Sequence, residues 1–588
     1  MRIQKTIALL GSLLLLGMAV SSLILSPGEP LPLWHTILAM AFALLWGALG
    51  LKGRGRSLRR MNILAGFLLL LCSLVEFVIP SFPLYGLMLS NPLYTYHPYI
   101  GAGVGLLVLL VSFLTRLPRP SPFAATGFLV LAVFLLSACS GPSLSSLTFR
   151  YETDPDLSQA LSLPRTDFPS TQFLVASDLH YYDPALGTSG PSFQAYIDSD
   201  RKMLAQSQEL LETLIGEIGR SQAQFVLISG DLTKDGEKPN HERMATFLAT
   251  IEQGGRQVFV VPGNHDIENP DAVRYTATGT EPVPVVTPAE FAQIYQDFGY
   301  GQALARDPNS LSYLVEPVPG LWLLAIDSCD YADNLAMGEP QTNGRLTQER
   351  LDWIETMLAQ AKTQKKAVLA MCHHNLMEHY DSQQKNFGEY LLDDYPQIGN
   401  MLARFSVPVI FSGHYHAQDV TLTRYDDGSV LYDVETGSLV SYPVPYRLVA
   451  IGADQTMTLR TGQIATIPSF SAQGKDFPTY ALEFTQSGVE TVAQQVMTDL
   501  NLFGILQMNA TEIAEIVPQI GRAFIAHYGG DERFPGGVKL KFRGLSIAGK
   551  MVIYNRAGLV LGLWQDKEPV DRNLVINLVT GGWQALTP

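Results

Sequence analysis

The chain has 588 residues, a net charge of −15 and a hydrophobic content of 47%. This length predicts two or more domains, and the acidic balance argues against a nucleic-acid polymer as a partner, which would require a basic surface. The apolar residues are concentrated before residue 140, so a membrane part and an ordinary globular part are expected.

Residues 1–120 are predicted to form a transmembrane domain of about four helices. Apolar segments near 7–25, 34–51, 62–83 and 98–115 each approach the ~20 residues needed to cross a bilayer. Lys and Arg precede the first segment, separate the second from the third, and follow the fourth, while the other loops contain neither. By the positive-inside rule, this is a multi-pass cell-membrane protein whose later residues lie on the extracytoplasmic side.

Residues 121–140 form a fifth apolar segment with two interpretations. It is either a transmembrane helix or a lipoprotein signal, because Leu136-Ser137-Ala138-Cys139 resembles a bacterial lipobox. In the second case Cys139 is lipidated and the chain is cut before it. Residues 141–167 are polar and without periodicity, so we expect a linker.

Short β-rich runs alternate with helical stretches between residues 168 and 465. This alternation predicts an α/β layered domain. Further strands are expected at 425–431 and 447–460. The main strands are expected at 171–176, 225–228, 257–261, 322–326, 367–371 and 407–411, and the helices at 203–218, 242–251, 288–298 and 347–361.

Residues 470–588 are predicted to form a small, mostly helical carboxyl-terminal domain. Helical periodicity covers 480–502 and 510–526, and the remainder has no clear pattern. His527 is expected at the surface of this tail.

Polar side chains follow five of the predicted strands. They supply carboxylates, imidazoles and one amide, a ligand set that suits Mn, Fe or Zn. Two such ions about 3.5–4 Å apart neutralise phosphoryl oxygens and supply a hydroxide at neutral pH. We interpret Asp231 as the carboxylate that bridges two metal ions. The groups are Asp178 and His180, Asp231, Asn264 with His265 and Asp266, His373 with His374, and His414 with His416.

Taken in order, these groups resemble the motifs of the calcineurin-like metallophosphoesterases. The segments Ala176–Tyr181, Gly230–Lys238, Ile294–Tyr300 and Asn309–Tyr313 resemble a bacterial cell-surface subgroup similar to cyclic-nucleotide phosphodiesterases with a helical carboxyl-terminal domain. The resemblance implies a layered β-sandwich flanked by helices. It also implies hydrolysis of phosphodiesters, cyclic nucleotides among them, by a metal-bound hydroxide.

The family pattern also implies a role for each residue. One ion would be held by Asp178, His180, Asp231 and His416, and the other by Asp231, Asn264, His373 and His414. His265 would stabilise the phosphoryl transition state or protonate the leaving oxygen, and Asp266 would orient His265 or cap the following segment. His374 would support the ligands or face the substrate.

Several alternatives stay open at this point. The enzyme could be a phosphomonoesterase or a hydrolase of cell-envelope phosphodiesters. In a different class, the chain could be a membrane sensor or scaffold whose phosphoesterase-like domain only binds a ligand. Cys329 and Cys372 could form a disulfide or remain free. His241 and His379 are expected to be structural, and the oligomeric state is not predicted.

Overall fold

A computed structural model describes residues 147–499, 508–534 and 545–586 of the chain. The predicted transmembrane segments and Cys139 lie outside these residues. Among the helices that are described, none is both long and apolar enough to cross a bilayer. The described residues, from Leu147 onward, form one compact unit.

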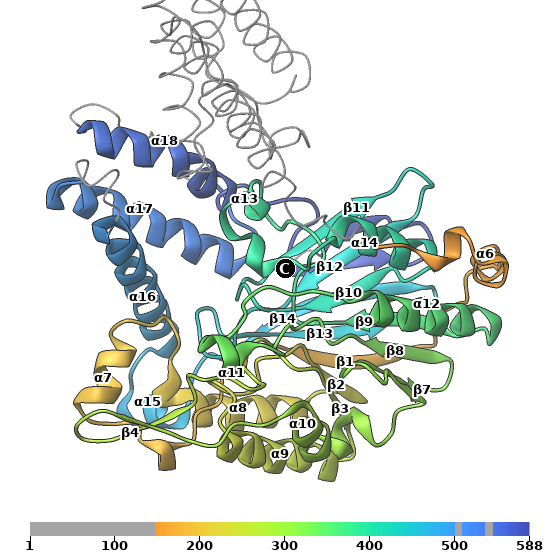
Figure 1. Cartoon of the computed structure of the whole chain (residues 1–588), viewed down its shortest axis with the longest axis horizontal. Coiled ribbons are helices and arrows are strands. Elements are labelled where there is room, and N and C mark those ends of the chain that lie inside the picture. Colours follow the sequence, from red (N-terminus) through yellow and green to blue (C-terminus); the bar gives the residue numbers. More distant parts are fainter. Residues whose placement is uncertain (1–146, 500–507, 535–544, 587–588) are drawn as a thin grey trace, which may run out of the picture. The chain divides into compact units, whose positions relative to one another are not determined.

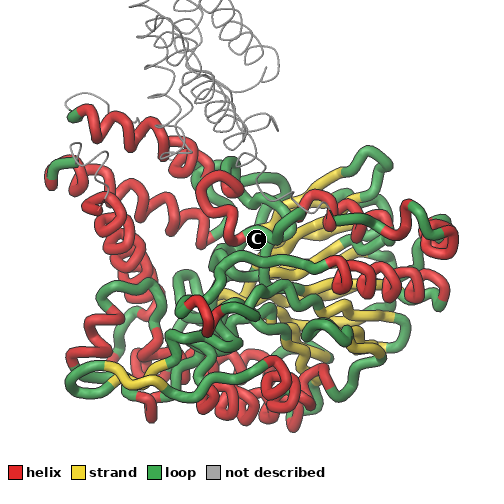
Figure 2. Tube along the Cα trace, in the orientation of Figure 1, coloured by secondary structure: helices red, strands yellow, loops and turns green. Residues whose placement is uncertain are grey.

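Two seven-stranded sheets form the centre of this unit (Figures 1 and 2). The first sheet has the order β16-β15-β14-β13-β1-β2-β3, and the second β11-β12-β10-β9-β8-β7-β6. The strands of the first sheet are β1 (Thr171–Ala176), β2 (Phe225–Ile228), β3 (Gln257–Val260), β13 (Pro445–Ile451), β14 (Thr456–Gln463), β15 (Asn573–Asn577) and β16 (Trp583–Ala585). Those of the second are β6 (Ala305–Arg306), β7 (Tyr313–Val318), β8 (Leu321–Ala325), β9 (Ala367–Met371), β10 (Val409–Ser412), β11 (Val420–Arg424) and β12 (Val430–Glu435).

The strand β9 shows how the sequence builds the layers. Its side chains at 367, 369 and 371 belong to the core between the sheets, whereas those at 368 and 370 pack under the outer helices. A strand buried on both faces needs apolar residues at every position, which is why this segment reads Ala-Val-Leu-Ala-Met. Phe173 of β1 and Phe411 of β10 meet across the inner core with ring centroids 5.5 Å apart.

Helices cover both outer faces of the sandwich. The first sheet packs against α8 (Ser207–Arg220), α9 (Lys238–Gln253) and α10 (Pro288–Ile294), and the second against α12 (Gln348–Thr363) and α14 (Tyr395–Arg404). The predicted α/β layered sandwich is therefore the observed architecture. Shorter elements are α7 (Pro191–Ile197), α11 (Asn334–Met337), α13 (Gln383–Phe387) and the hairpin of β4 (Val273–Tyr275) and β5 (Thr280–Pro282).

The described part of the predicted linker is structured. Residues 155–161 form α6 (Pro155–Leu161), which Asp154 caps by accepting hydrogen bonds from two backbone N–H groups. Tyr151 and Leu157 are buried in the core beneath α12. The helix is short and its apolar residues are few, so periodicity did not reveal it. Residues 147–167 thus belong to the globular unit.

The structure also differs from two other predicted strands, at 425–431 and 447–460. Residues 425–429 make the turn between β11 and β12, because Asp427 and Gly428 favour a turn there. Residues 447–460 form a hairpin instead of one strand, with its turn at Gly452–Gln455.

The tail is mostly helical but not separate from the sandwich. Its helices are α15 (Pro468–Gln473), α16 (Phe477–Asp499), α17 (Ala510–Gly529) and α18 (Ile547–Gly562). The strands β15 and β16 then extend the first sheet through antiparallel pairing of β15 with β14. The predicted boundary near residue 470 therefore does not divide the sheet from the tail.

Candidate metal centre

The polar groups predicted from the sequence meet at the carboxyl ends of five strands from both sheets. Asp178 and His180 follow β1, Asp231 follows β2, Asn264 follows β3, His373 follows β9, and His414 and His416 follow β10. The ligand atoms of Asp178, His180, Asp231 and His416 form one group, and those of Asp231, His373 and His414 form another. In each group all the atoms lie within 4.8 Å of one another. Asp231 belongs to both groups.

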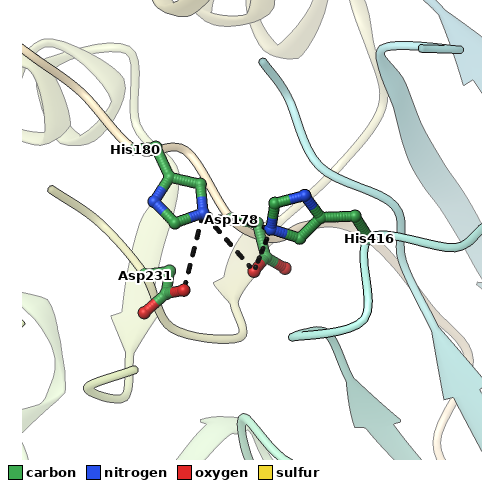
Figure 3. A group of neighbouring side chains, drawn as sticks. All are labelled: Asp178, His180, Asp231 and His416. Atoms are coloured by element: carbon green, nitrogen blue, oxygen red, sulfur yellow. Dashed lines mark hydrogen bonds and ion pairs between the residues drawn. The ribbon is translucent and has the colours of Figure 1, made fainter. Parts of the chain in front are cut away.

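Four atoms converge in the first group (Figure 3). His180 Nε2 lies 3.1 Å from His416 Nε2 and 3.5 Å from Asp231 Oδ2. His416 Nε2 lies 3.4 Å from Asp178 Oδ1. Neighbouring ligands of an ion bound at about 2.0–2.2 Å have separations of about 3 Å, so this group fits one divalent ion.

The second group is arranged in the same way around Asp231. His373 Nε2 lies 3.4 Å from Asp231 Oδ2 and 3.2 Å from Asn264 Oδ1. The amide oxygen of Asn264 therefore lies beside this group, next to His373. The Oδ2 atom of Asp231 faces both His180 and His373, as a bridging oxygen must.

Backbone groups hold the atoms that face away from the centre. The His265 N–H donates to Asp231 Oδ1 at 3.0 Å, and the His414 N–H donates to Asp178 Oδ2 at 3.0 Å. His373 Nδ1 lies 2.8 Å from the Ser229 carbonyl oxygen, which fixes the ring so that Nε2 is free to bind a metal. Asp178 Oδ1 is buried without a hydrogen-bond donor among the described residues, and a cation would satisfy it.

The backbone at these positions is strained. Five of the seven candidate ligand residues have a positive φ, a backbone conformation that residues other than glycine rarely adopt. Such strain persists where surrounding structure enforces it, as at functional sites. The values are 51° for Asp178, 40° for His180, 50° for Asp231, 78° for His414 and 69° for His416.

Two glycines allow the loops to approach one another. Gly230 has a φ of +95°, and a Cβ there would lie 2.5 Å from His373 Nδ1. A Cβ on Gly413 would lie 1.9 Å from Ser177 Oγ. A larger residue at either position would push the ligand loops apart.

The electrostatics also suit cations. Burial lowers the pKa values of His180, His414 and His416, so these imidazoles are neutral and able to ligate. Burial would also lower the pKa of His373, but the Asp231 carboxylate raises it to about 9. Burial alone would raise the pKa of Asp231, whereas His373 and the other histidines hold it well below its ordinary value. Without metal ions, the proton on His373 thus partly balances the negative charge of Asp231.

His265 lies beside the centre but outside the two ligand groups. Its side chain is 25% exposed, and its ring centroid is 5.0 Å from that of His180. Its Nδ1 donates to Asp235 Oδ1 at 2.8 Å. Burial would raise the pKa of Asp235, but Lys234 and His265 lower it, so Asp235 is a carboxylate. Asp235 is therefore the residue that orients His265.

Asp266 has a different place from the one predicted. Its buried carboxylate accepts hydrogen bonds from the N–H groups of Leu232, Thr233 and Gly263 and from the Thr233 hydroxyl, at 2.9–3.0 Å. It is fully buried, and none of these hydrogen bonds involves the His265 ring. Asp266 fixes the loop that carries Asp231, so the orienting role that the family pattern implied for it belongs to Asp235 instead.

His374 supports the second group. Its Nδ1 lies 2.8 Å from Ser328 Oγ and its Nε2 lies 2.9 Å from the Thr342 carbonyl oxygen. Its ring centroid is 4.4 Å from that of His414. With both nitrogens occupied, His374 packs against a ligand and is not one itself.

Other histidines and cysteines are structural, as far as the described residues show. His241 is buried, with Nε2 2.8 Å from the Asp266 carbonyl oxygen. His379 is buried against Asp419. Cys329 and Cys372 are free and buried, so they form no disulfide.

Asp235, Arg201 and Lys202 lie near the centre and were not predicted from the sequence. Asp235 stands in the segment Gly230–Lys238 that carries the subgroup resemblance, so its signal was present but was given no role. Arg201 and Lys202 precede a helix without any motif, and only the folded structure brings them beside His416.

One comparison with known protein families identifies this region. Residues 171–418 match the sequence model of the calcineurin-like phosphoesterase family. Among curated proteins, no sequence matched the chain. In a search of solved structures, a dimetal phosphatase from Danio rerio is 15% identical with a TM-score of 0.37, and the match covers 50% of this chain and 97% of that one.

A purple acid phosphatase from yellow lupin (Lupinus luteus) seeds is 12% identical with a TM-score of 0.34. That match covers 54% of each chain, so this chain spans about half the length of the plant protein. The chain carries a calcineurin-like phosphoesterase domain at residues 171–418, the core of a metal-dependent phosphoric ester hydrolase that uses two divalent metal ions.

Proposed function

We propose that the domain hydrolyses phosphodiesters, with cyclic nucleotides as the first candidates. The observation that carries the proposal is the Asp231 oxygen shared by two ligand groups, with His265 beside them. When bound, two divalent ions neutralise the phosphoryl oxygens and lower the pKa of the attacking water. The chain's own residues then have to position the ester and supply a proton.

His265 is the proposed general acid. Because its Nδ1 donates to Asp235 Oδ1, its Nε2 is directed away from Asp235 and available to the leaving oxygen. General acid catalysis typically contributes about 10²–10⁴-fold. Asp235 acts as a positioning residue, which keeps the ring in one orientation.

Two cations and one aromatic ring support an organic phosphate ester as substrate. After burial itself, the positive charges of Arg201 and Lys202 lower the pKa of His416, so both cations lie near this ligand. We propose that Arg201 binds a phosphoryl oxygen. The half-buried Tyr390 ring has its centroid 4.5 Å from that of His414 and offers a flat surface to a sugar or base. A phosphodiester, which keeps an organic group on each side of the phosphorus, would contact both Arg201 and the Tyr390 ring.

The experiment is a substrate panel on the purified full chain with added Mn²⁺. We expect bis-p-nitrophenyl phosphate and cyclic nucleotides to be hydrolysed faster than p-nitrophenyl phosphate, and His265→Ala to lose most of this turnover. A preference for the monoester would indicate a phosphomonoesterase instead. If envelope phosphodiesters were cleaved and cyclic nucleotides were not, the enzyme would act on the cell envelope. No hydrolysis of any ester would favour the ligand-binding sensor or scaffold.

We also propose that the chain is anchored in the cell membrane with this domain on the extracytoplasmic side. The support is the apolar segments before residue 140 and the Lys and Arg residues in alternate loops. A reporter fused after residue 150 should be active only outside the cytoplasm, and cytoplasmic activity would contradict this topology. Labelling with a lipid precursor, with Cys139→Ala as control, separates the lipoprotein signal from a fifth span.

A further inference from the structure

A second group of ionisable side chains lies where the tail meets the loop after His416. We call it the tail cluster. Asp419 follows the ligand loop, and the other members come from the end of α17 and from the segment between α18 and β15. The ligand atoms of Asp419, His527 and Glu532 lie within 4.8 Å of one another, and so do those of Asp531, Asp566 and Asp571.

The tail cluster is buried. Asp419 is 1% exposed, His527 0%, Glu532 6% and Asp571 0%. The surface position predicted for His527 is therefore wrong, because the segment from 527 to 534 folds back onto the phosphoesterase sandwich through the hydrogen bond from the Gln418 N–H to the Tyr528 carbonyl oxygen. Buried carboxylates in such a place require partners.

Several of these oxygens have no donor among the described residues. They are Asp419 Oδ2, Glu532 Oε2 and Asp566 Oδ1. His527 Nδ1 lies 2.6 Å from Glu532 Oε1 and 3.4 Å from Asp419 Oδ2, so a proton on this nitrogen is directed to Glu532. His379 occupies only the other oxygen of Asp419, at 2.6 Å.

The buried guanidinium of Arg447 does not neutralise the cluster directly. Its N–H groups donate to the backbone carbonyl oxygens of Asp419, Glu435 and Asp571, and not to their carboxylates. Among the described residues, two histidines thus contact the five carboxylates, His527 at Glu532 and His379 at Asp419. Burial, together with Glu532 and Asp419, raises the pKa of Asp566 to about 8, and burial raises the pKa of Asp571 well above its ordinary value. Asp566 and Asp571 therefore take up protons unless another cation is present.

A route to solvent is available. Asp566 lines an open surface groove of about 520 Å³ together with Glu378 and Lys567. Asp531 and Asp566 are only partly buried. A hydrated cation can thus reach the cluster without unfolding of the tail.

We propose that the tail cluster binds Ca²⁺ at a site separate from the two catalytic ions. Carboxylate oxygens dominate the cluster, and Ca²⁺ accepts six to eight oxygen ligands in flexible geometry. The bound ion would hold Asp419, on the loop that carries His414 and His416, against Glu532 and Asp566 of the tail. The proposal does not depend on which ester the enzyme hydrolyses.

The test uses the full chain with Asp231→Asn, so that the shared catalytic ligand is removed. After treatment with chelator, ⁴⁵Ca²⁺ binding is measured by equilibrium dialysis. We expect one tightly bound ion per chain. Adding Glu532→Gln and Asp566→Asn should weaken this binding at least about 100-fold, because loss of a ligand costs more than the 10–100-fold typical of a ligand's neighbour.

Thermal unfolding distinguishes lost binding from misfolding. Without cations, the double variant Glu532→Gln/Asp566→Asn should have a Tm equal to that of the unmodified chain or higher, because unpaired buried charges are removed. CaCl₂ should raise the Tm of the unmodified chain but not that of the double variant. Absence of Ca²⁺ binding in the Asp231→Asn chain, or equal binding after the two further substitutions, would overturn the proposal.

Discussion

The catalytic ligand set and the tail cluster are both buried, but they are built differently. The first combines two aspartates and one asparagine with four histidines, and five of its residues have positive φ. The second has five carboxylates and one histidine, and within it only Asp531 has positive φ, at 54°. Strain is therefore associated with ligands that must hold two ions at a fixed separation, whereas the tail cluster is formed mostly by packing of unstrained backbone.

The largest effect that tests this comparison is expected from Asp231→Asn. The amide cannot supply a bridging charged oxygen, so turnover should fall at least about 10³-fold, or ~4 kcal/mol in transition-state stabilisation. Metal analysis should show loss of at least one catalytic ion per chain, while Ca²⁺ binding by the tail cluster is unchanged.

The control for Asp231→Asn is Asp198→Asn, the same chemical change at an exposed position at the end of α7. It should retain full turnover and metal content. If Asp231→Asn kept near-normal turnover with two ions bound, the assignment of Asp231 as the bridge would fail.

A smaller loss is expected from Asp235→Asn. The amide still reaches His265 but orients its ring less firmly than the carboxylate does, so kcat should fall about 10–100-fold. Both catalytic ions should remain bound, and KM should change less than kcat. A purely structural role would instead lower the Tm and the metal content, and Asp235→Glu should restore part of the activity.

The difference between the clusters also explains what the sequence could predict. Each catalytic ligand directly follows an apolar strand, and parallel strands bring their carboxyl ends together, so Asp178, Asp231 and His373 could be placed before the fold was known. The tail cluster joins residues as distant in sequence as Asp419 and Asp571, and none follows a strand within a motif. Its signal exists only after burial, when unpaired carboxylates become costly.

Contacts between residues distant in sequence also explain the regions where the prediction and the structure differ. In the segment before the first strand, Tyr151 and Leu157 are isolated apolar residues, and only their contact with α12 makes them core. The strands β15 and β16 likewise need β14 as a partner, because a short strand has no stability alone. Asp266 and Asp235 are both carboxylates near His265 in sequence, and their roles separate only when hydrogen-bond directions are seen.

The smallest effect concerns pH in the absence of divalent ions. Asp566 has a folded pKa of about 8, raised by burial and by Glu532 and Asp419, with Asp531 and His527 also facing it, against an unfolded value of about 3.9. A group whose pKa is raised on folding contributes stability at low pH and loses it as the pH rises, here between about 4 and 8.

The Tm of chelator-treated wild-type protein should therefore fall between pH 6 and pH 9. Asp566→Asn should reduce this loss by about 2 °C, since solvent at this partly buried group weakens the effect. Asp571 and Glu435 also have raised pKa values, so some slope should remain. Addition of CaCl₂ should flatten the wild-type profile, because an ion replaces the protons. An equal slope in wild type and Asp566→Asn, measured by thermal unfolding across this range, would show that the carboxylates of the tail cluster titrate as ordinary surface groups and would remove the contrast with the catalytic set.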